Sequence, residues 1–198
     1  MTRSRRDLTE SRVQTELVYQ GEFLTVRKDL ALLPDGSHGL REYVQHPGAA
    51  AMIPLFDDGR LLIERQYRYP SRQTFVEFPA GKLDAGETSF QTATRELLEE
   101  TGYSAAQWAY LTRIHPAIGF CDEIIDLYLC RDLTRQTQKL DDGEFVELDI
   151  VTLGWLMDEL RAGRLTDVKT QIAVHWLDRM QGGQWPWPAF GPQAGPPG

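Results

Sequence analysis

The segment from residue 88 to residue 101 restricts the fold of this chain more than any other. Three of its apolar side chains recur at helical spacing and so share one face: Phe90, Ala93 and Leu97. Thr88 or Ser89 can cap the first turn of such a helix, and Gly102 follows at the place where a glycine ends one. The pattern therefore predicts an amphipathic helix whose apolar face packs on the rest of the protein.

Three carboxylates lie on the same predicted helix. Glu96, Glu99 and Glu100 fall at i, i+3 and i+4, so they share a face close beside the apolar stripe. Because like charges at this spacing destabilise a helix, we expect this face to hold a compensating cation. Carboxylate oxygens suit Mg²⁺ or Mn²⁺, which keep several waters and accept phosphate oxygens as further ligands.

A wider segment, from Gly81 to Tyr103, contains this helix and resembles the Nudix box of the Nudix hydrolases. Glu87 follows Gly81 after five residues, and after seven more the sequence reads Arg-Glu-Leu-Leu-Glu-Glu-Thr-Gly-Tyr from Arg95. Such a match is far more specific than a lone glycine-rich motif. The alternative, a solvated acidic helix face, leaves the placing of Gly81, Glu87 and Arg95 unexplained.

The resemblance implies a role for each residue of the box. The implied metal ligands are the backbone carbonyl of Ala80 and the side chains of Glu96, Glu99 and Glu100. The implied structural residues are Gly81, Glu87, Arg95 and Gly102, with an ion pair between Glu87 and Arg95 that braces the helix. The implied chemistry is attack of a metal-activated water on phosphorus, with Mg²⁺ as cofactor and Mn²⁺ as a substitute.

Flanking sequence resembles the ADP-ribose pyrophosphatase branch of the same family. The segments that carry this resemblance are residues 64–70, 77–83 and 116–123. It implies that Arg68 contacts phosphate, Glu77 a ribose hydroxyl and Arg41 the nucleotide end of the substrate. The expected reaction is hydrolysis of the pyrophosphate bond of a nucleoside diphosphate sugar, with ADP-ribose giving AMP and ribose 5-phosphate.

Other interpretations of function stay open. Pro116 follows the box slightly earlier than the marker proline of that branch, so GDP-mannose, another nucleotide sugar or a nucleoside triphosphate is an alternative substrate. A Nudix fold kept as a catalytically silent ligand sensor is a further alternative. The intact acidic set of the box argues against a sensor, because binding alone does not need water-activating carboxylates.

A fourth catalytic carboxylate is expected on a loop before the last strand. Asp141, Asp142 and Glu144 precede an alternating apolar run that begins at Phe145. Glu144 lies at the entrance of this predicted strand, where it can orient the attacking water when the loop closes. A solvated acidic turn is the open alternative for these residues.

The remaining patterns predict strands before the box and a mixture of strands and helices after it. Strands are predicted at residues 17–19, 23–28, 30–33, 40–44, 49–56, 61–66, 108–114 and 124–130, and helices at 153–161 and 168–180. The turn at residues 57–60 implies a central hairpin between the runs 49–56 and 61–66. The order of elements predicts an α/β (α+β) fold, and the resemblance makes it a Nudix-type α/β/α sandwich with a central mixed sheet and an N-terminal antiparallel sheet.

The chain divides into three predicted parts. Residues 1–46 are N-terminal strands, expected to serve dimerisation and substrate binding because this branch exchanges such strands within a homodimer. Residues 47–181 form the hydrolase domain. Residues 182–198 contain five prolines and predict an extended, merely tethered tail, with docking of Trp185, Trp187 and Phe190 as the open alternative.

Composition excludes several classes of partner. The formal net charge is −8 and no Lys/Arg-rich stripe occurs, so polymeric nucleic acid is not expected to bind. No stretch approaches the ~20 apolar residues of a membrane span, and two cysteines are too few for a disulfide scaffold. We therefore expect a cytoplasmic enzyme whose partner is a small-molecule nucleotide.

Overall fold

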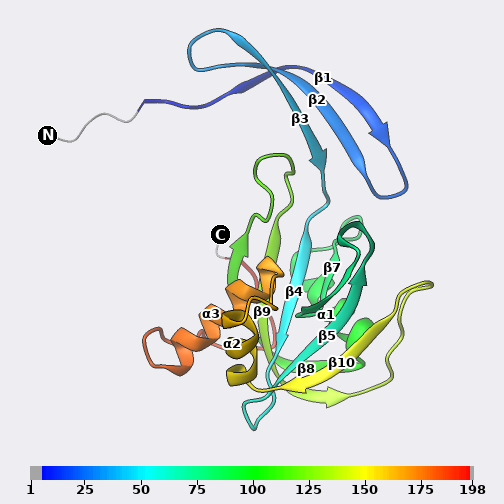
Figure 1. Ribbon diagram of the computed structural model, residues 1–198, viewed down its shortest axis with the longest axis vertical. Coiled ribbons are helices and arrows are strands. Elements are labelled where there is room, and N and C mark those ends of the chain that lie inside the picture. The colour runs from blue at the N-terminus through cyan, green and yellow to red at the C-terminus, as the bar shows by residue number, and fades with distance from the viewer. Residues whose placement is uncertain (1–5, 197–198) are drawn as a thin grey trace, which may run out of the picture. The chain divides into compact units, whose positions relative to one another are not determined.

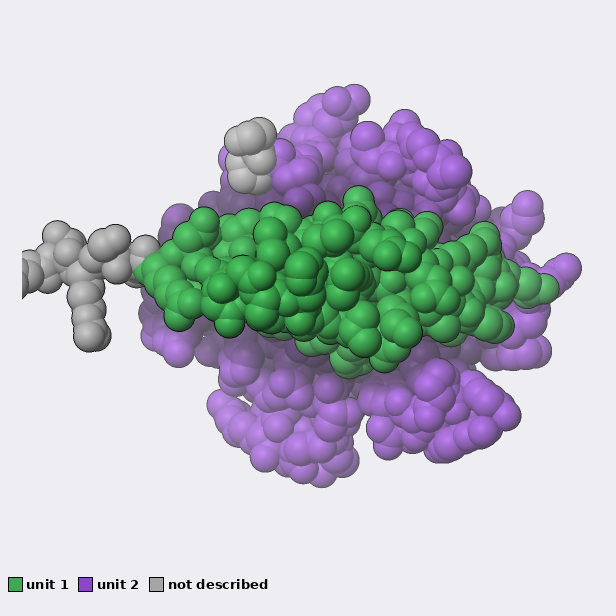
Figure 2. All heavy atoms as spheres, turned by 90° about the horizontal axis from the view of Figure 1, so that it is seen from above, with its two compact units in different colours: residues 1–46, 117–123 green, residues 47–116, 124–198 purple. Residues whose placement is uncertain are grey.

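The computed structural model describes residues 6–196 and divides the chain into two compact units. The first unit contains the residues up to His46 together with 117–123, and the second contains 47–116 and the residues from 124 onward. Figure 2 colours the two units separately. Residues 1–5 of the predicted N-terminal part and residues 197–198 of the predicted tail lie outside the described residues.

The first unit is built on an antiparallel sheet with the order β1-β2-β3. Its strands are β1 (Ser11–Gln20), β2 (Thr25–Leu32) and β3 (His38–Gln45). The last two form a hairpin, and in the turn between them Gly36 adopts a φ of 85° that a glycine tolerates. The separate strands predicted at 23–28 and 30–33 are one strand, because Asp29 pairs in register with Thr15 and Arg41 and interrupts neither ladder.

The segment 117–123 joins this unit through the end of β3. The backbone N–H of Val44 donates to Phe120 O at 2.8 Å, and Asp122 N donates to Val44 O at 3.2 Å. The backbone N–H of His46 also donates to the Asp122 carboxylate at 2.7 Å. These bonds satisfy main-chain groups that a strand at the edge of a sheet would otherwise leave without partners.

The second unit contains a central mixed sheet with the order β7-β4-β9-β8. Its strands are β4 (Ala49–Pro54), β7 (Ala80–Lys82), β8 (Tyr103–Ile114) and β9 (Ile125–Arg135). β4 runs parallel to β9, whereas the other pairs are antiparallel. A further antiparallel sheet has the order β10-β5-β6, from β5 (Leu61–Arg68), β6 (Gln73–Glu77) and β10 (Val146–Val151), with a short 3-10 helix, η1 (Tyr69–Ser71), between β5 and β6.

The predicted central hairpin between residues 49–56 and 61–66 is wrong. A turn does join β4 to β5, but the two strands belong to different sheets and meet at an isolated bridge between Leu55 and Leu61. The physical reason is that β4 already pairs with β7 on one side and β9 on the other. Because both of its edges are used, its main chain cannot form a ladder with a third strand.

Helices cover both faces of the mixed sheet, which confirms the predicted α/β/α arrangement (Figure 1). Along β4 the buried side chains alternate, with Ala49, Ala51 and Ile53 in one apolar cluster and Ala50 and Met52 in the other. The first cluster also contains side chains of α2 (Leu153–Arg161) and α3 (Val168–Gln181), and the second contains side chains of α1 (Ser89–Thr101). No helix among residues 6–196 is long and apolar enough to cross a membrane.

The ends of α1 follow its sequence signals. The backbone N–H of Gln91 donates to Thr88 Oγ1, and the Gln91 side chain accepts from the Thr88 N–H at 2.9 Å, so the two residues form a capping box. At the other end Gly102 adopts a φ of 68° and its N–H donates to Leu98 O. The predicted helix and both of its ends are confirmed.

The expectation of a merely tethered tail is wrong. Gly191 and Trp108 exchange two backbone hydrogen bonds, of 2.7 and 3.0 Å, so the tail pairs with β8. The Phe190 ring packs under the Arg131 guanidinium, 4.0 Å from ring centroid to Cζ, and the Trp185 ring lies 4.7 Å from that of Trp176. Although prolines exclude a ladder, one N–H from a glycine is enough for a single bridge.

Candidate active site

The three carboxylates of α1 have different surroundings. Glu96 and Glu99 both accept a hydrogen bond from Arg95 Nη1, at 2.8 and 3.0 Å. Glu100 is only 3% exposed, and its Oε2 atom accepts no hydrogen bond from any residue between 6 and 196. Burial raises the pKa of Glu100 well above its usual value, and the charges of Glu64 and Glu96 raise it further.

Arg95 also forms the ion pair with Glu87. Its Nε and Nη2 atoms donate to the Glu87 carboxylate at 3.0 and 2.9 Å, and the Thr92 hydroxyl donates to the same group at 2.8 Å. The Arg95 hydrogen bond lowers the pKa of Glu87 to about 2. Arg95 Nη2 further donates to the backbone carbonyl of Lys82 at 3.2 Å, so one side chain links α1, β7 and the loop between them.

Gly81 allows α1 to lie directly against β7. A Cβ atom at this position would stand 1.9 Å from Glu96 Cδ, far inside any van der Waals contact. Glycine is therefore the residue that leaves room for the Glu96 carboxylate. Ala80, whose carbonyl is the predicted backbone ligand, precedes Gly81 on this same strand, which pairs with β4 and packs on α1.

A buried ion-pair network lies on β5 and β6. Arg68 donates to both oxygens of Glu77, at 2.8 and 2.9 Å, and Lys169 Nζ donates to Glu77 as well. Lys169 is held in turn by Asp167, at 3.1 Å. Burial raises the pKa of Glu77, but the Arg68 hydrogen bond and the Lys169 charge outweigh it and leave the pKa below its usual value.

Two residues of this region carried no predicted role. Lys169 lies in the first turn of α3, and Glu64 directly follows the apolar run Leu61–Ile63 of β5. Glu64 is fully buried, and its pKa is raised to about 8. Burial is the main cause, the charge of Glu77 acts in the same direction, and the charge of Lys169 lowers the pKa. A charged residue in step with buried positions of a strand is the signal that could have identified Glu64.

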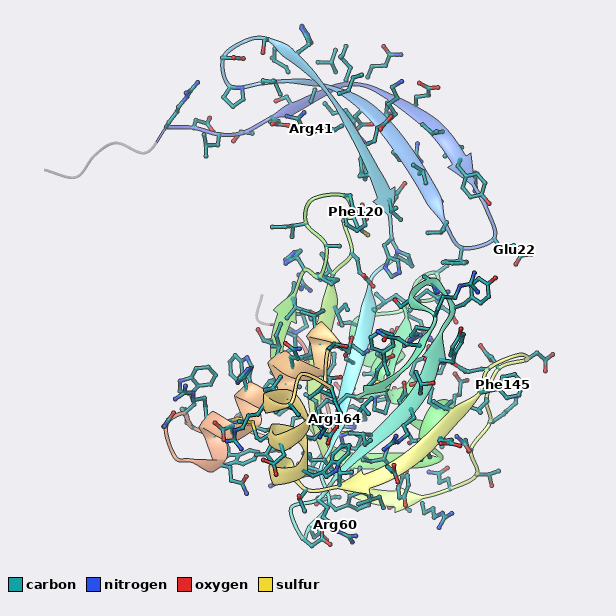
Figure 3. All side chains as sticks on the ribbon, in the orientation of Figure 1. Glu22, Arg41, Arg60, Phe120, Phe145 and Arg164 are labelled. Atoms are coloured by element: carbon teal, nitrogen blue, oxygen red, sulfur yellow. The ribbon has the colours of Figure 1, made fainter. Side chains whose placement is uncertain are left out.

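Glu144 lies on a turn that leads into β10. Its backbone N–H donates to Asp141 O at 3.0 Å, and its carboxylate accepts from Gln66 Nε2 at 3.2 Å. The preceding loop is fixed to the end of α1, because Lys139 N donates to Glu99 O at 3.0 Å. The predicted strand start at Phe145 is wrong by one residue: β10 begins at Val146, and Phe145 is 81% exposed (Figure 3).

Arg41 is the one predicted site residue that belongs to the first unit. It lies on β3 (Figure 3), and its Nη2 atom pairs with Glu10 Oε1 at 2.6 Å. The second unit contains all of the others: Arg68, Glu77, Ala80, Gly81, Glu87, Arg95, Glu96, Glu99, Glu100, Gly102 and Glu144.

The donor set of the second unit fits a hard divalent cation. Within residues 6–196 no three acidic, His or Cys side chains stand ready in a common metal-ligand arrangement, and Arg95 holds Glu96 and Glu99. Glu100 nevertheless keeps a buried oxygen with no donor, beside further carboxylates. Crowded carboxylate oxygens that lack donors are the ligands that Mg²⁺ and Mn²⁺ prefer.

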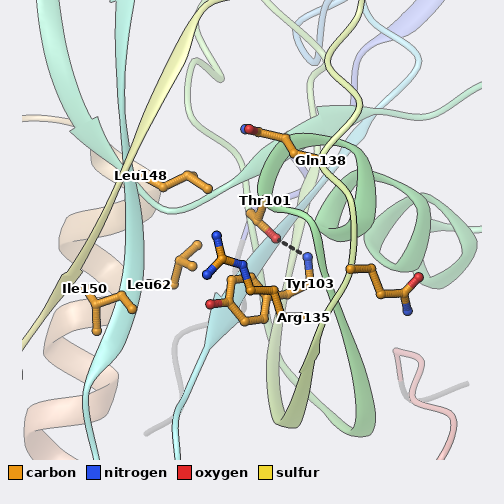
Figure 4. Close-up of a pocket in the computed structure, with 8 residues that line it drawn as sticks. Leu62, Thr101, Tyr103, Arg135, Gln138, Leu148 and Ile150 are labelled. Atoms are coloured by element: carbon orange, nitrogen blue, oxygen red, sulfur yellow. Dashed lines mark hydrogen bonds between the residues drawn. The ribbon is translucent and has the colours of Figure 1, made fainter.

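A cavity of about 260 Å³ lies between the end of α1, the start of β8 and the β10-β5-β6 sheet (Figure 4). Leu62, Leu148 and Ile150 form its apolar side, on the same face of the sheet as Glu64. Its polar side includes Arg135 and Tyr103, whose backbone N–H donates to Thr101 Oγ1 at 3.1 Å. The cavity is thus lined by apolar side chains and by the Arg135 guanidinium group. Thr101, which follows Glu100, lines it as well.

Comparison with known proteins agrees with this geometry. A family model described as NUDIX domain matches residues 45–170, and one described as Nucleoside diphosphate sugar hydrolase N-terminal domain matches residues 10–44. A methanol dehydrogenase activator of Bacillus methanolicus is 39% identical, over 85% of this chain and 92% of its own. An ADP-ribose pyrophosphatase of Bacillus subtilis is 36% identical, over 87% and 94%.

A solved structure shows the same fold. The crystal structure of an ADP compounds hydrolase superposes with a TM-score of 0.78 at 21% identity, and the match covers 91% of this chain and 98% of that one. The family model, which spans more than half of the sequence and contains α1 with its acidic face, identifies the chain. The protein belongs to the Nudix hydrolase family.

Proposed function

We propose that this protein hydrolyses the pyrophosphate bond of a nucleoside diphosphate sugar, with ADP-ribose as substrate and AMP and ribose 5-phosphate as products. The observation that carries the proposal is the acidic face of α1, where Glu100 is buried with an unsatisfied oxygen beside Glu96 and Glu99. The match of residues 10–44 to a nucleoside diphosphate sugar hydrolase domain supports this class of substrate.

In this proposal Glu96, Glu99, Glu100 and the Ala80 carbonyl hold Mg²⁺, or Mn²⁺ in its place. The cation supplies Lewis-acid chemistry, which activates water and offsets phosphate charge. Glu144 orients the attacking water and accepts its proton, because a loop carboxylate beside the site can approach on closure. Arg95 keeps Glu96 and Glu99 in position through the hydrogen bonds described above.

Arg68 and Glu77 are proposed to bind the substrate after a local exchange of partners. Glu77 is almost fully buried and already accepts hydrogen bonds from Arg68 and Lys169, so we propose that a turn of Arg68 opens the carboxylate to a ribose hydroxyl. Arg68 is 41% exposed and can turn to a phosphate, which a guanidinium binds in the same bidentate way. Lys169 stays on Glu77 and keeps its charge compensated. Arg41 is proposed to contact the nucleotide end.

Product analysis tests this function. The purified protein would be incubated with ADP-ribose, GDP-mannose or a nucleoside triphosphate, each with Mg²⁺ and with excess chelator, and the products separated by chromatography. We expect AMP from ADP-ribose, in the presence of Mg²⁺ only, at a higher kcat/KM than for the other substrates. Faster cleavage of another substrate would reassign the specificity, and binding of ADP-ribose without turnover would indicate a sensor.

The first unit supports a homodimer as part of this proposal. All ten residues of β1 are exposed, and four of its apolar side chains are between 46% and 56% exposed: Val13, Leu17, Val18 and Tyr19. An uncovered apolar strand of this length is a typical subunit interface, and a second copy of the chain would cover it. Light scattering after size exclusion should give twice the mass of 22.6 kDa. A monomer at micromolar concentration would contradict the assembly.

A further inference from the structure

Glu64 is a buried carboxylate that the proposed reaction does not yet use. Leu62, Glu64 and Gln66 alternate on one face of β5, and the register places Glu64 opposite Glu77 on β6 and Leu148 on β10. Glu64 is 0% exposed, and neither of its oxygens accepts a hydrogen bond within the part of the chain that the structure describes.

The cations near Glu64 are already engaged by other acids. Lys169 donates to Glu77 and Asp167, and Arg68 donates to Glu77. An ionised carboxylate that is buried without its own partner destabilises the fold. The positive charges that face Glu64 are therefore too few, since Glu77, Glu100 and Glu144 face it as well.

Glu100 is a second buried carboxylate with an oxygen that accepts no hydrogen bond from the described residues, and it lies on a different element. Its Oε2 atom also has no donor among residues 6–196, and Glu64 and Glu100 act on each other electrostatically. One of these carboxylates lies on α1 and the other on β5. Carboxylates on a single helix face can surround a cation from one side only, and a strand carboxylate opposite them supplies oxygen from another side.

We propose that Glu64 is a ligand of the divalent cation bound by Glu100. The site then has ligands from α1, from the Ala80 carbonyl on β7 and from the β10-β5-β6 sheet. This inference rests on the cation site of the proposed function. The competing explanation is that Glu64 and Glu100 share a proton and Glu64 binds no metal.

Binding of Mn²⁺ to the full chain tests the ligand, with no substrate present. Free Mn²⁺ would be measured by electron paramagnetic resonance during titration of wild type, Glu64→Gln and the control Glu147→Gln, an exposed acid on β10. We expect Glu64→Gln to weaken binding about tenfold or more and Glu147→Gln to leave it unchanged. Without metal, Glu64→Gln should melt at the same temperature as wild type or higher, because the substitution removes no hydrogen bond of the Glu64 carboxylate.

Each outcome decides between the explanations. Unchanged Mn²⁺ affinity in a folded Glu64→Gln variant would overturn the proposal. A lower melting temperature without metal would also count against it, because it indicates a structural role. Glu64→Leu, which needs no hydrogen bond, is the second variant, and failure of both to fold would contradict the proposal. If wild type itself binds no Mn²⁺, the cation site of the proposed function fails instead.

Discussion

Glu100 and its two helix neighbours differ in how their charges are balanced. Arg95 contacts Glu96 and Glu99 and also Glu87, so part of the charge of these carboxylates is compensated within the protein. Glu100 keeps an oxygen without a donor among the described residues and is more deeply buried than either. Its charge is therefore the one most available to a cation brought by the solvent or the substrate.

Replacing Glu100 should therefore affect chemistry more than folding. We expect Glu100→Gln to lower kcat by on the order of 10²–10³, the usual effect of removing a group that stabilises developing charge. Steady-state kinetics at saturating Mg²⁺ would measure it, with circular dichroism as the check on folding. Glu159→Gln, at an exposed ion pair with Arg164, is the control and should keep full activity. A Glu100 variant with wild-type kcat would remove this residue from the site.

Glu144 is expected to act on the rate more than on binding. If its carboxylate orients water only in the closed complex, Glu144→Gln should lower kcat with little change in KM. Asp142 lies on the same turn and is exposed, so Asp142→Asn should change the free energy of unfolding and of activation by no more than about 0.5 kcal/mol. Kinetics of the two variants would check this. An inactive Asp142→Asn beside a fully active Glu144→Gln would transfer the role to Asp142.

At the scale of single elements, the Glu87–Arg95 pair links α1 to the chain before it. The pKa of Glu87 is about 2, so this carboxyl group is more acidic in the folded protein than in the unfolded chain. The pair thus stabilises the fold above about pH 4.3, and this contribution is lost as the pH falls towards 2. Glu87→Gln should cost about 1–2 kcal/mol at neutral pH, because water still reaches the pair.

Thermal melts of wild type and Glu87→Gln between pH 2 and pH 8 would measure this contribution. The difference between their melting temperatures should be constant at neutral pH and should shrink below about pH 4. A difference that persisted unchanged to pH 2 would mean that the carboxylate charge is not its source.

The contact between β7 and α1 predicts a steric effect of Gly81→Ala. The new methyl group would overlap the Glu96 carboxylate and force α1 or the side chain to move, at a cost of about 1–3 kcal/mol. Metal affinity should fall with stability, because Glu96 is displaced. Gly119→Ala is the matched control, since nothing lies within 4 Å of a Cβ at that position. Calorimetry and metal titration of both variants would test this, and a Gly81→Ala protein that matched wild type would exclude the close packing.

The sequence predicted an element well where the residues that determine its ends lie within or next to that element. The ends of α1 depend on Thr88 and Gly102, which act within a turn of their own position, and both follow the prediction. The pairing of β4 could not be predicted in this way, because its partners β7 and β9 lie far along the chain. The surroundings of Glu64 could not be predicted for a related reason: the acidic groups that face it lie on other elements, far along the chain.

At the scale of the whole molecule, the tail contributes to the stability of the second unit. Its docking depends on side chains of β9 and α3, so a rule based on proline content alone predicted the wrong state. We expect deletion of residues 185–198 to lower the melting temperature while the folded fraction keeps its kcat. Calorimetry and kinetics on the shortened chain would check both, and an unchanged melting temperature would show that the tail adds nothing.

The pairing of Gly191 with Trp108 has a consequence for self-association. β8 is at the outer side of its sheet, and an open outer strand can recruit a strand from another chain and begin aggregation. Gly191 occupies the main-chain groups of Trp108 that such a strand would use. During synthesis β8 emerges well before Gly191, so every nascent chain passes through an interval in which this edge is open to its neighbours on the same messenger RNA.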